Sequence, residues 1–382
     1  MLGRLWDLGH TPINLPVLKI YIELYHKQSE KDLLVSGFSQ GFRLQYTGPR
    51  LPLNSKNLFS AEKNKLDTLN KLQKEVELGR MLGPFNHKPI STLRISPIGL
   101  VEKSDHSWRL LTHLSYPKDN SVNDFIDEQL CTVKYASFDK VLDMISSLGR
   151  STQLGKIDIR QAFRLFIVNP ADFDLLGIKF DGKYYIDKCL PMGCSISCAL
   201  FENFSTFLHW VVEIKAGLST LDHYLDDFKF AGAALTNDCQ KIMDTFSLVS
   251  KELGVPLAEN ETEGQKTKII FLGLEIDAVL MKVKFPGDKL NKLRLGIQYI
   301  LEHKKMKFKE LESIVGLMAF CAQAIPSARA FIRRFYDLIS EVRVKKSYYY
   351  VRINQEIKSD AEVWLEFLKN LMGSVIFQRI IG

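Results

Sequence analysis

The sequence has no long hydrophobic run, no internal repeat and no low-complexity tract. Its apolar stretches fall short of the ~18 residues that a membrane-spanning helix needs. The N-terminal segment Met1–Pro12 carries Arg4, Asp7 and His10 and has no apolar stretch typical of a signal peptide. The six cysteines show no disulfide-framework spacing. These absences argue against a membrane or secreted protein and predict an intracellular one, nuclear or cytoplasmic.

The sequence also has little excess of either charge. Its 382 residues include 51 Lys and Arg against 44 Asp and Glu, with 46% hydrophobic and 25% charged residues, as in a globular protein of two or three lobes. The basic residues are concentrated between Lys282 and Lys346, where 15 stand against 6 acidic ones. Such a segment is typical of a polyanion-binding surface and equally of a solvated helical face.

The hydrophobic periodicity predicts an α+β part followed by an all-helical part. Residues 1–60 are expected to be irregular. Helices are predicted over 61–80, 195–216, 236–253, 288–303, 307–324 and 327–343. Strands are predicted over 154–159, 165–168, 221–225, 228–231 and 269–276, with a strand–turn–strand unit over 93–114 around Ser104-Asp105 and a hairpin over 176–190 turning at Asp181-Gly182. The α+β part has the element order of a split βαβ sheet.

Three carboxylates in the α+β part are candidates for a catalytic metal site. Asp158 ends a predicted strand, and Asp226-Asp227 occupy the tip of a predicted hairpin with apolar flanks. An isolated Asp-Asp pair is most often a solvated turn, but a structural two-residue turn favours Asn-Gly or Asp-Gly instead. Three carboxylates at one sheet edge form an oxygen-rich site suited to Mg²⁺, and this predicts two-metal phosphoryl or nucleotidyl transfer.

Around these carboxylates the sequence resembles a reverse transcriptase, and the resemblance extends over most of the chain. Four segments resemble motifs of that family. The first palm motif is similar to Lys156–Phe163 and the second to Leu190–Phe201. The Tyr-x-Asp-Asp motif is similar to Tyr224–Asp227, and the primer-grip hairpin to Phe271–Leu274. Five further segments resemble the polymerase of DIRS-type retrotransposons, which carry a tyrosine recombinase. They are Thr11–Asn14, Tyr46–Arg50, His113–Pro117, Tyr184-Tyr185 and Ile325–Arg334.

The resemblance implies a right-hand polymerase fold with fingers, a palm built on an antiparallel split βαβ sheet, and a helical thumb. It implies an N-terminal extension with a lead-in helix over 1–90, interleaved fingers and palm over 91–285, a thumb over 286–345, and a truncated start of a connection or RNase H-like region over 346–382. The acids of an RNase H site are absent from the sequence.

The implied activity is that of an RNA-directed DNA polymerase from a retrotransposon. Such an enzyme extends a primer on an RNA or DNA template with deoxynucleoside triphosphates and uses two Mg²⁺ ions, or Mn²⁺. A non-catalytic nucleic-acid-binding remnant of a mobile element is the alternative. An RNA-templated RNA polymerase is a second rival, and the aromatic side chain of Phe163 argues against it.

The resemblance assigns roles to individual residues. Asp158, Asp226 and Asp227 are expected to be catalytic and, with Ile159, to form the metal site. Nucleotide binding is expected of Lys103, Arg109, Phe163, Met192 and Gly193, with Phe163 packing against the sugar, and the primer grip is expected at Phe271, Leu272 and Gly273. Arg329, Arg333 and Arg334 are spaced to share one helix face, which either follows a phosphate backbone or is solvated.

The sequence departs from the family pattern at two positions. Glu261 aligns with a lysine that protonates the leaving pyrophosphate, and Lys266 and Lys268 lie nearby as alternatives. Met192 replaces the usual Gln or Phe of the second motif.

Three other residues have structural interpretations. Cys194 and Cys198 are interpreted as structural thiols and not as zinc ligands, because no second Cys or His pair has ligand spacing. His223 is assigned to packing.

Overall fold

The computed structural model describes residues 2–103, 106–135, 137–342, 348–370 and 374–376. The chain forms two compact units. The first comprises residues 1–135, 157–228 and 242–262, and the second comprises residues 136–156, 229–241 and 263–382. Strands β6 (Gln153–Asp158) and β10 (Asp227–Gly232) pass from one unit into the other. The predicted turn residues Ser104 and Asp105 lie outside the described residues.

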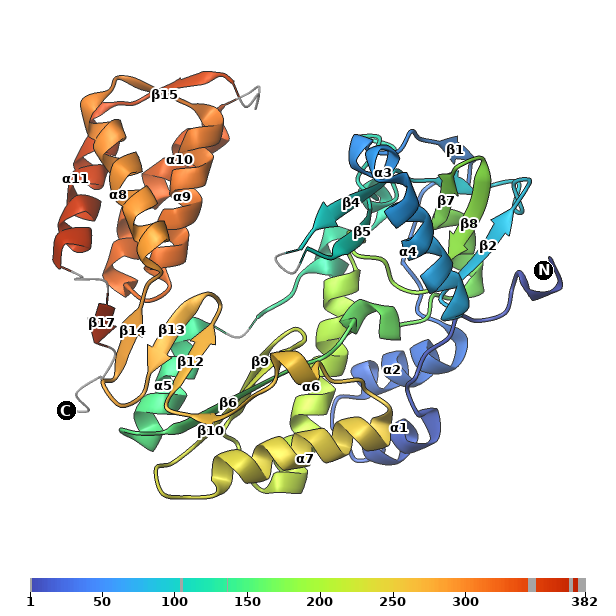
Figure 1. Cartoon of the computed structure of the whole chain (residues 1–382), viewed down its shortest axis with the longest axis horizontal. Coiled ribbons are helices and arrows are strands. Elements are labelled where there is room, and N and C mark those ends of the chain that lie inside the picture. The colour runs from blue at the N-terminus through green and yellow to red at the C-terminus, as the bar shows by residue number, and fades with distance from the viewer. Residues whose placement is uncertain (1, 104–105, 136, 343–347, 371–373, 377–382) are drawn as a thin grey trace. The chain divides into compact units, whose positions relative to one another are not determined.

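The first unit contains most of the mixed helical and stranded part (Figure 1). Its helices are α1 (Leu15–Ile22), α2 (Gln28–Gln40), α3 (Phe59–Lys63), α4 (Lys65–Glu77), α6 (Ser197–Ala216) and most of α7 (Asp238–Leu253). Its strands are β1 (Leu53–Asn54), β2 (Met81–Phe85), β3 (Arg94–Ile95), β4 (Ile98–Glu102), β5 (Trp108–Thr112), β7 (Gly177–Phe180), β8 (Lys183–Asp187) and β9 (Leu221–Tyr224). Five strands form one sheet in the order β1-β3-β7-β8-β2, and β4 pairs with β5.

An apolar core joins α3 and α4 to the strands beside them. Its buried members are Ala61, Leu72, Met81, Ile98, Ile178, Phe180 and Tyr185. The predicted helix over 61–80 is interrupted at Asn64, whose φ of −107° and ψ of 55° are not helical. The hairpin predicted over 176–190 is confirmed as β7–β8, with Asp181 and Gly182 both at positive φ in its turn.

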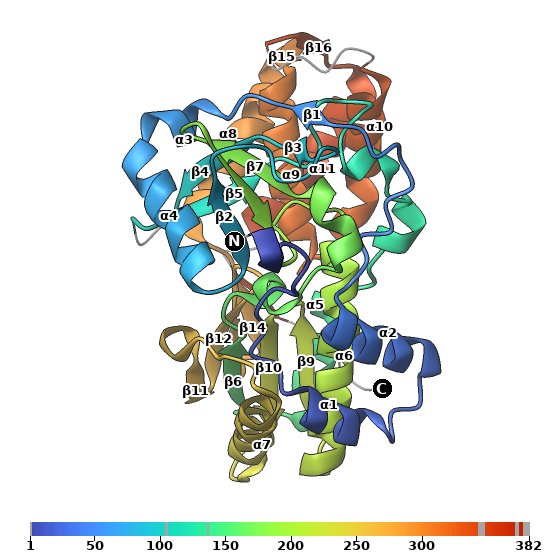
Figure 2. The ribbon, with the colours of Figure 1, turned by 90° about the vertical axis from the view of Figure 1, so that its right-hand side faces the viewer.

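The prediction that residues 1–60 are irregular is wrong, because α1 and α2 lie within them. Helix α1 begins after Asn14, whose side chain accepts a hydrogen bond from the Val17 N–H (3.4 Å). Helix α2 ends at Gly41, where φ is +89° and an added Cβ would lie 2.4 Å from the backbone nitrogen of Asn169. Leu34 and Phe38 bury the inner face of α2, which packs beside α6 (Figure 2). Both helices are short, and their apolar pattern is weak.

A buried carboxylate anchors the segment after α2. The Asp172 side chain is fully buried and accepts hydrogen bonds from Arg43 Nε (2.8 Å), the Leu44 N–H (2.8 Å) and Arg50 Nη2 (2.6 Å). Burial alone would raise the pKa of Asp172, but these hydrogen bonds and the two guanidinium groups hold it below its usual range.

We expect Asp172→Asn to lower the free energy of unfolding by about 3–5 kcal/mol, because it leaves Arg43 and Arg50 without their buried partner. The pKa of Asp172 is lower in the folded chain than in the unfolded chain, where it is about 3.9. The carboxylate therefore contributes its full stabilisation above about pH 3.9, and this stabilisation is lost as the pH falls through the pKa of the folded chain. Denaturant unfolding at neutral and acid pH measures both effects. Asp32→Asn, at an exposed position, is the control and should change stability by less than about 0.5 kcal/mol.

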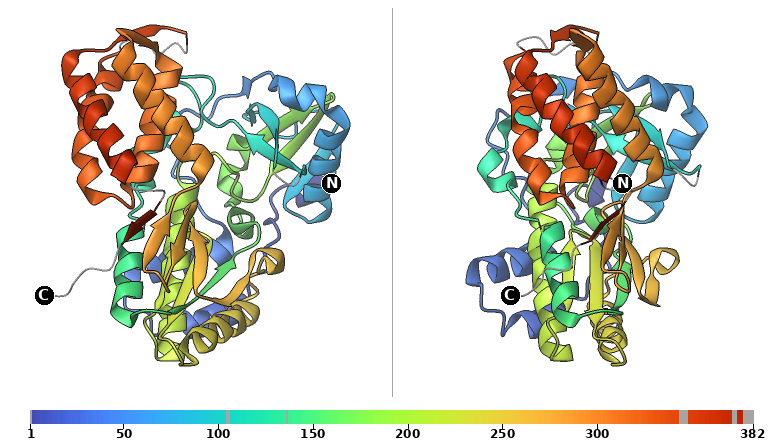
Figure 3. Two further views of the ribbon diagram at one scale, coloured as in Figure 1. Left: turned by 60° about the vertical axis from the view of Figure 1, so that its left-hand side comes forward. Right: turned by 90° about the vertical axis from the view of Figure 1, so that its left-hand side faces the viewer.

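The second unit contains a small sheet and a helical bundle. Its helices are α5 (Phe138–Leu148), α8 (Gly287–Glu302), α9 (Phe308–Ala322), α10 (Arg333–Glu341) and α11 (Gln355–Asn370). Its strands are β11 (Glu263–Lys266), β12 (Lys268–Phe271), β13 (Leu274–Asp277), β14 (Lys282–Lys284), β15 (Lys305–Lys307), β16 (Tyr350–Arg352) and β17 (Ser374–Ile376). A second sheet has the order β12-β13-β14-β17, and the bundle is shown in orange and red in Figure 3.

Helix α11 was not predicted. It packs against α8, and Trp364 of α11 is fully buried and donates its indole N–H to the Phe331 carbonyl (3.1 Å). Among the helices of the described residues, none is both long enough and apolar enough to cross a membrane.

Three predicted elements differ from the structure. The strand predicted over 269–276 is a hairpin, because Leu272 and Gly273 have φ of +46° and +80° and reverse the chain between β12 and β13. The helix predicted over 327–343 is a 3₁₀ helix (Pro326–Phe331) followed by α10, and residue 343 lies outside the described residues. In place of a strand over 165–168, the chain has a 3₁₀ helix (Ala162–Leu165) and two isolated bridges.

Candidate active site

The hairpin of β9 and β10 presents Asp226 and Asp227 at its tip. Leu225 and Asp226 form the turn, and Leu225 has a φ of +54°, which is unfavourable for a side chain of its size. Phe228 and Phe230 in β10 are buried and fix the strand, whereas the two acids are only half-buried. A costly backbone conformation next to paired acids is typical of a functional turn.

Backbone hydrogen bonds bring the end of β6 to this turn. The Ile159 N–H donates to the Asp226 carbonyl (3.0 Å), so Asp158 precedes a residue held directly against the hairpin tip. The carbonyl of Asp158 accepts from the Ala258 N–H (2.9 Å), and Glu261 follows in a short 3₁₀ helix (Glu259–Glu261). The three chain segments that carry Asp158, Asp226 and Glu261 are therefore joined by backbone hydrogen bonds within the first unit.

The electrostatic environment of Asp226 reflects this convergence. Burial raises the pKa of Asp226, and the negative charges of Asp227 and Glu261 raise it further, whereas its own backbone N–H and the Arg109 guanidinium lower it. The carboxylate is thus destabilised in its ionised form as long as no cation compensates for its neighbours. Hard oxygen donors with excess negative charge fit a divalent cation such as Mg²⁺.

Arg109 and Lys103 come from the β4–β5 hairpin. Arg109 pairs with Val101 in the register of the two strands, and its exposed side chain is close enough to influence Asp226. Lys103 follows β4, and its backbone N–H donates to the Ser107 carbonyl (2.8 Å) while its side chain is exposed. The electrostatic link to Asp226 therefore favours Arg109 over Lys103 as a site residue.

Phe163 lies in the 3₁₀ helix that follows β6. Its ring is half-buried and packs edge-to-face on Phe201 of α6, with centroids 5.7 Å apart. The next residue, Arg164, is held by Asp187 (2.8 Å) and Glu75 (2.7 Å), which fixes the short helix in place. The ring therefore has a defined position and still keeps part of its surface accessible.

The loop with Met192 and Gly193 is fixed against β5. Gly193 has a φ of +101°, and an added Cβ would lie 2.7 Å from the Thr112 carbonyl oxygen. The Asn123 side chain donates to the Gly193 carbonyl (2.8 Å) and accepts from the Ser195 N–H (3.0 Å). Asn123 is thus a positioning residue that sequence reasoning missed, since nothing local to its segment points to residues 193–195. Met192, which directly precedes Gly193, is half-buried.

The predicted primer grip lies in the second unit. Phe271 is buried and stacks on Phe138, with centroids 5.7 Å apart and planes inclined by 10°. Leu272 and Gly273 form the turn, and Gly273 lies close to Phe320, whose ring also carries the Lys289 ammonium 4.0 Å from its centroid. Phe271 thus anchors the hairpin in the core, whereas the turn at Gly273 is exposed.

The three arginines do not share one helix, because the chain changes from a 3₁₀ helix to α10 between Arg329 and Arg333. Arg329 forms a two-bond ion pair with Asp139 (2.9 and 3.1 Å). Arg334 is bonded to the buried carboxylate of Asp360 (2.7 Å). Arg333 is exposed. Two of the three guanidinium groups therefore have intramolecular partners.

The cysteine interpretation is compatible with the structure. All six cysteines are free thiols, and burial raises the pKa of the Cys194 thiol to about 12. Cys198 is half-buried on α6. A thiol that resists ionisation is a poor metal ligand.

The fold is that of the right-hand polymerase class, as comparisons with solved structures show. The chain is 19% identical to a foamy viral protease-reverse transcriptase solved in complex with double-stranded DNA, with a TM-score of 0.59, over 93% of this chain and 60% of that one. A foamy viral protease-reverse transcriptase in complex with an RNA/DNA hybrid gives a TM-score of 0.55 at 18% identity, over 93% of this chain and 46% of that one. The predicted fold class is confirmed.

Sequence comparison leads to viral proteins. The chain is 28% identical over 183 residues to Protein P of duck hepatitis B virus (strain China), covering 46% of this chain and 22% of that protein. It is 22% identical over 250 residues to the Pro-Pol polyprotein of simian foamy virus type 1, covering 65% of this chain and 20% of that protein. No family model matches the chain. It is thus similar to viral reverse transcriptases and spans about a fifth of the length of these curated relatives.

Proposed function

We propose that the chain is an RNA-directed DNA polymerase that extends a primer with deoxynucleoside triphosphates. The observation that carries the proposal is the backbone contact of Ile159, the residue after Asp158, with Asp226 at a strained hairpin tip, in a fold shared with foamy viral reverse transcriptases. The mutual repulsion at Asp226 favours a role in holding cations over a purely structural turn.

In this proposal Asp158, Asp226 and Asp227, with Ile159 beside them, hold two Mg²⁺ ions, or Mn²⁺. When bound, such ions lower the pKa of the primer 3′-hydroxyl and neutralise charge on the triphosphate. Arg109, with Lys103 as a weaker candidate, contacts the triphosphate oxygens through charge-assisted hydrogen bonds. Phe163 packs against the sugar, while Met192 and Gly193 shape the nucleotide site. The protein thus contributes positioning and charge neutralisation more than covalent chemistry.

The duplex contacts are proposed for the second unit. The turn at Leu272 and Gly273, anchored by Phe271, would support the primer. Arg333 is the best candidate for a phosphate contact, because Arg329 and Arg334 already hold Asp139 and Asp360. The four-part division into an extension to residue 90, fingers and palm to 285, thumb to 345 and a connection-like end stays a prediction. Origin in a DIRS-type retrotransposon and an intracellular location are part of the proposal.

Primer extension tests the proposed function. The purified chain is given a primed RNA template, a primed DNA template of the same sequence, Mg²⁺ and the four deoxynucleotides. Extension on the RNA template supports the proposal. Duplex binding without extension on either template would instead establish the alternative of a nucleic-acid-binding remnant. A parallel reaction contains the four ribonucleotides instead, and extension only in that reaction would indicate an RNA polymerase.

Phe163→Ala is expected to admit ribonucleotides, because the ring would no longer exclude a 2′-hydroxyl. The ratio of incorporation efficiencies for deoxy- and ribonucleotides should fall by about ten- to a hundredfold. Phe163→Tyr keeps the ring and serves as the control. An unchanged ratio in Phe163→Ala would mean that Phe163 only packs against Phe201.

A further inference from the structure

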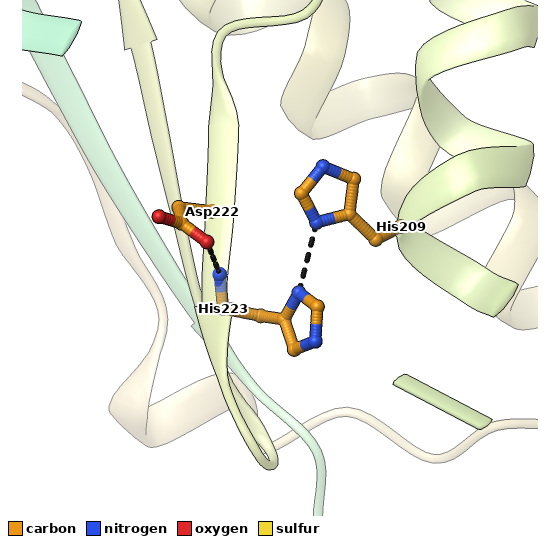
Figure 4. A group of neighbouring side chains, drawn as sticks. All are labelled: His209, Asp222 and His223. Atoms are coloured by element: carbon orange, nitrogen blue, oxygen red, sulfur yellow. Dashed lines mark hydrogen bonds between the residues drawn. The ribbon is translucent and has the colours of Figure 1, made fainter. Parts of the chain in front are cut away.

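A group of side chains in the first unit joins α6 to β9. His209 lies on α6, and Asp222 and His223 are consecutive in β9 (Figure 4). One potential ligand atom from each of the three residues lies within 4.8 Å of the others. The two imidazole rings face each other through their Nδ1 atoms, which are 2.8 Å apart. This group is separate from the predicted polymerase residues.

Each imidazole has a carboxylate behind it. The Nε2 atom of His209 lies 3.4 Å from Glu213 Oε1, and the Nε2 atom of His223 lies 3.2 Å from Glu202 Oε1. Both glutamates belong to α6, the helix that carries His209. A carboxylate at Nε2 favours a proton on that nitrogen and directs the Nδ1 lone pair to the opposite side. Here both Nδ1 atoms point to the same place.

Packing alone does not explain this arrangement. His223 is nine-tenths buried and stacks on Phe228, with ring centroids 5.1 Å apart, and this contact requires no polar partner at Nδ1. Two Nδ1 lone pairs at 2.8 Å repel each other unless a proton lies between them. The Nε2 atom of His223 and the Oε2 atom of Glu202 are both buried and have no hydrogen-bond partner among the described residues, so these two side chains lie at ion-pair distance without a hydrogen bond. The negative charges of the neighbouring carboxylates would therefore be partly compensated by a cation bound between the two imidazoles.

We propose that His209 Nδ1, His223 Nδ1 and the Asp222 carboxylate bind one transition-metal ion, with Zn²⁺ the best match. Two imidazoles and one carboxylate with an open fourth position form an established zinc donor set, and imidazole disfavours Mg²⁺. Tetrahedral bonds of about 2.0–2.1 Å place two nitrogens about 3.3–3.4 Å apart, so the rings need to separate by about half an ångström. The ion would replace the single proton between them.

The remaining contacts are compatible with this site. Asp222 Oδ1 accepts a hydrogen bond from the His223 N–H (2.9 Å), and the carboxylate lies within 4.8 Å of the imidazole ligand atoms, so it needs to turn toward the rings to bind the ion. The His209 side chain retains 19% of its exposed area, so an ion can reach the cluster from solvent. The bound ion would cross-link α6 to β9, and β9 leads directly into the turn with Asp226. Binding of the ion does not depend on the proposed polymerase activity.

Cobalt binding tests the proposal. Metal-free chain in excess Mg²⁺ is titrated with Co²⁺ and followed by visible absorption, and Zn²⁺ is then added as competitor. We expect one Co²⁺ per chain with the intense bands of a four-coordinate site, displaced by Zn²⁺. His209→Asn should abolish these bands, and Glu213→Gln should weaken binding by about 10- to 100-fold through the loss of its support for His209.

His106→Asn is the matched control, because His106 also has a glutamate four residues away (Glu102, 2.9 Å) but lies outside the cluster. It should leave the bands unchanged. The proposal is overturned if the unmodified chain binds no Co²⁺ in excess Mg²⁺, or if His209→Asn binds Co²⁺ with the same spectrum and affinity. Circular dichroism shows whether each variant folds. The titration of the unmodified chain needs no variant, so absence of Co²⁺ binding there overturns the proposal even if His209→Asn does not fold.

Discussion

We expect Asp226→Asn to abolish the proposed primer extension and to leave duplex binding intact. The amide keeps the shape of the side chain but loses the charge that would hold a cation. Because a catalytic ion supplies several kcal/mol to the transition state and each 1.4 kcal/mol is about a tenfold change, the single-turnover rate should fall by at least about a thousandfold. Rapid-quench incorporation of one nucleotide measures the rate, and fluorescence anisotropy measures binding.

The same variant should not destabilise the metal-free fold. The pKa of Asp226 is raised by burial and then by Asp227 and Glu261, so the folded chain binds a proton more readily than the unfolded one. Stability from this group is therefore greatest at low pH and falls as the pH rises through the folded pKa. An uncharged amide removes that penalty, and thermal melting at neutral pH in a chelator should show an equal or higher melting temperature.

Asp181→Asn is the matched control for this experiment. Asp181 also lies in a two-residue hairpin turn, at a φ of +48°, and forms an ion pair with Lys65 (2.6 Å). Asparagine tolerates that conformation, and the position has no predicted role in catalysis. Extension by Asp226→Asn within threefold of the unmodified chain would contradict the assignment of Asp226 as a metal ligand. Loss of extension in Asp181→Asn would show that the assay responds to hairpin damage in general.

The sequence predicted those features that depend on short-range patterns. A hairpin turn was predicted at Asp226-Asp227, one residue from the observed turn at Leu225-Asp226, because apolar residues flank the paired acids on both sides. The β7–β8 hairpin was predicted because Asp181-Gly182 favours a two-residue turn. Such features are determined within ten residues of chain, and the structure has them close to the predicted bounds.

Features that depend on distant partners could not be predicted in this way. Arg329 has the spacing of a phosphate-tracking residue, but its partner Asp139 lies 190 residues away. His223 was assigned to packing because its neighbour His209 belongs to another element. The turn at Leu272-Gly273 was missed in the strand pattern because leucine rarely adopts a positive φ. For Arg329 and His223 a tertiary contact, and not a local preference, determines the partner of the side chain.

Glu261→Lys is the second prediction with a large expected effect. The resemblance to reverse transcriptases implies that Glu261 takes the place of a lysine that donates a proton to the leaving pyrophosphate. In the structure, Glu261 is close enough to Asp226 to raise the pKa of that carboxyl. An ionised glutamate cannot donate a proton at neutral pH, and it repels a triphosphate. General-acid assistance is typically worth about 10²–10⁴ in rate, so the lysine variant should incorporate nucleotides faster by up to that factor.

Two further variants separate charge from proton transfer. Glu261→Gln removes the repulsion but cannot donate as an ammonium does, so its gain should be much smaller than that of Glu261→Lys. Glu259→Lys, in the same 3₁₀ helix, is the matched control, because Glu259 is exposed and has no resolved influence on Asp226. Single-turnover rates at saturating nucleotide, with primer–template affinity measured in parallel, distinguish a faster chemical step from tighter binding of the duplex.

The competing candidates for the proton donor already have partners. Lys268 pairs with the buried carboxylate of Asp277 (3.0 Å), and Lys266 pairs with Glu263 (3.1 Å). If one of them were the donor, Lys266→Ala or Lys268→Ala would lower the rate and Glu261→Lys would change it little. Because Lys268 would first have to leave a buried acid, we expect Lys268→Ala to reduce stability more than rate. If none of these substitutions changes the rate, the segment takes no part in the chemistry, and proton transfer to pyrophosphate must come from solvent.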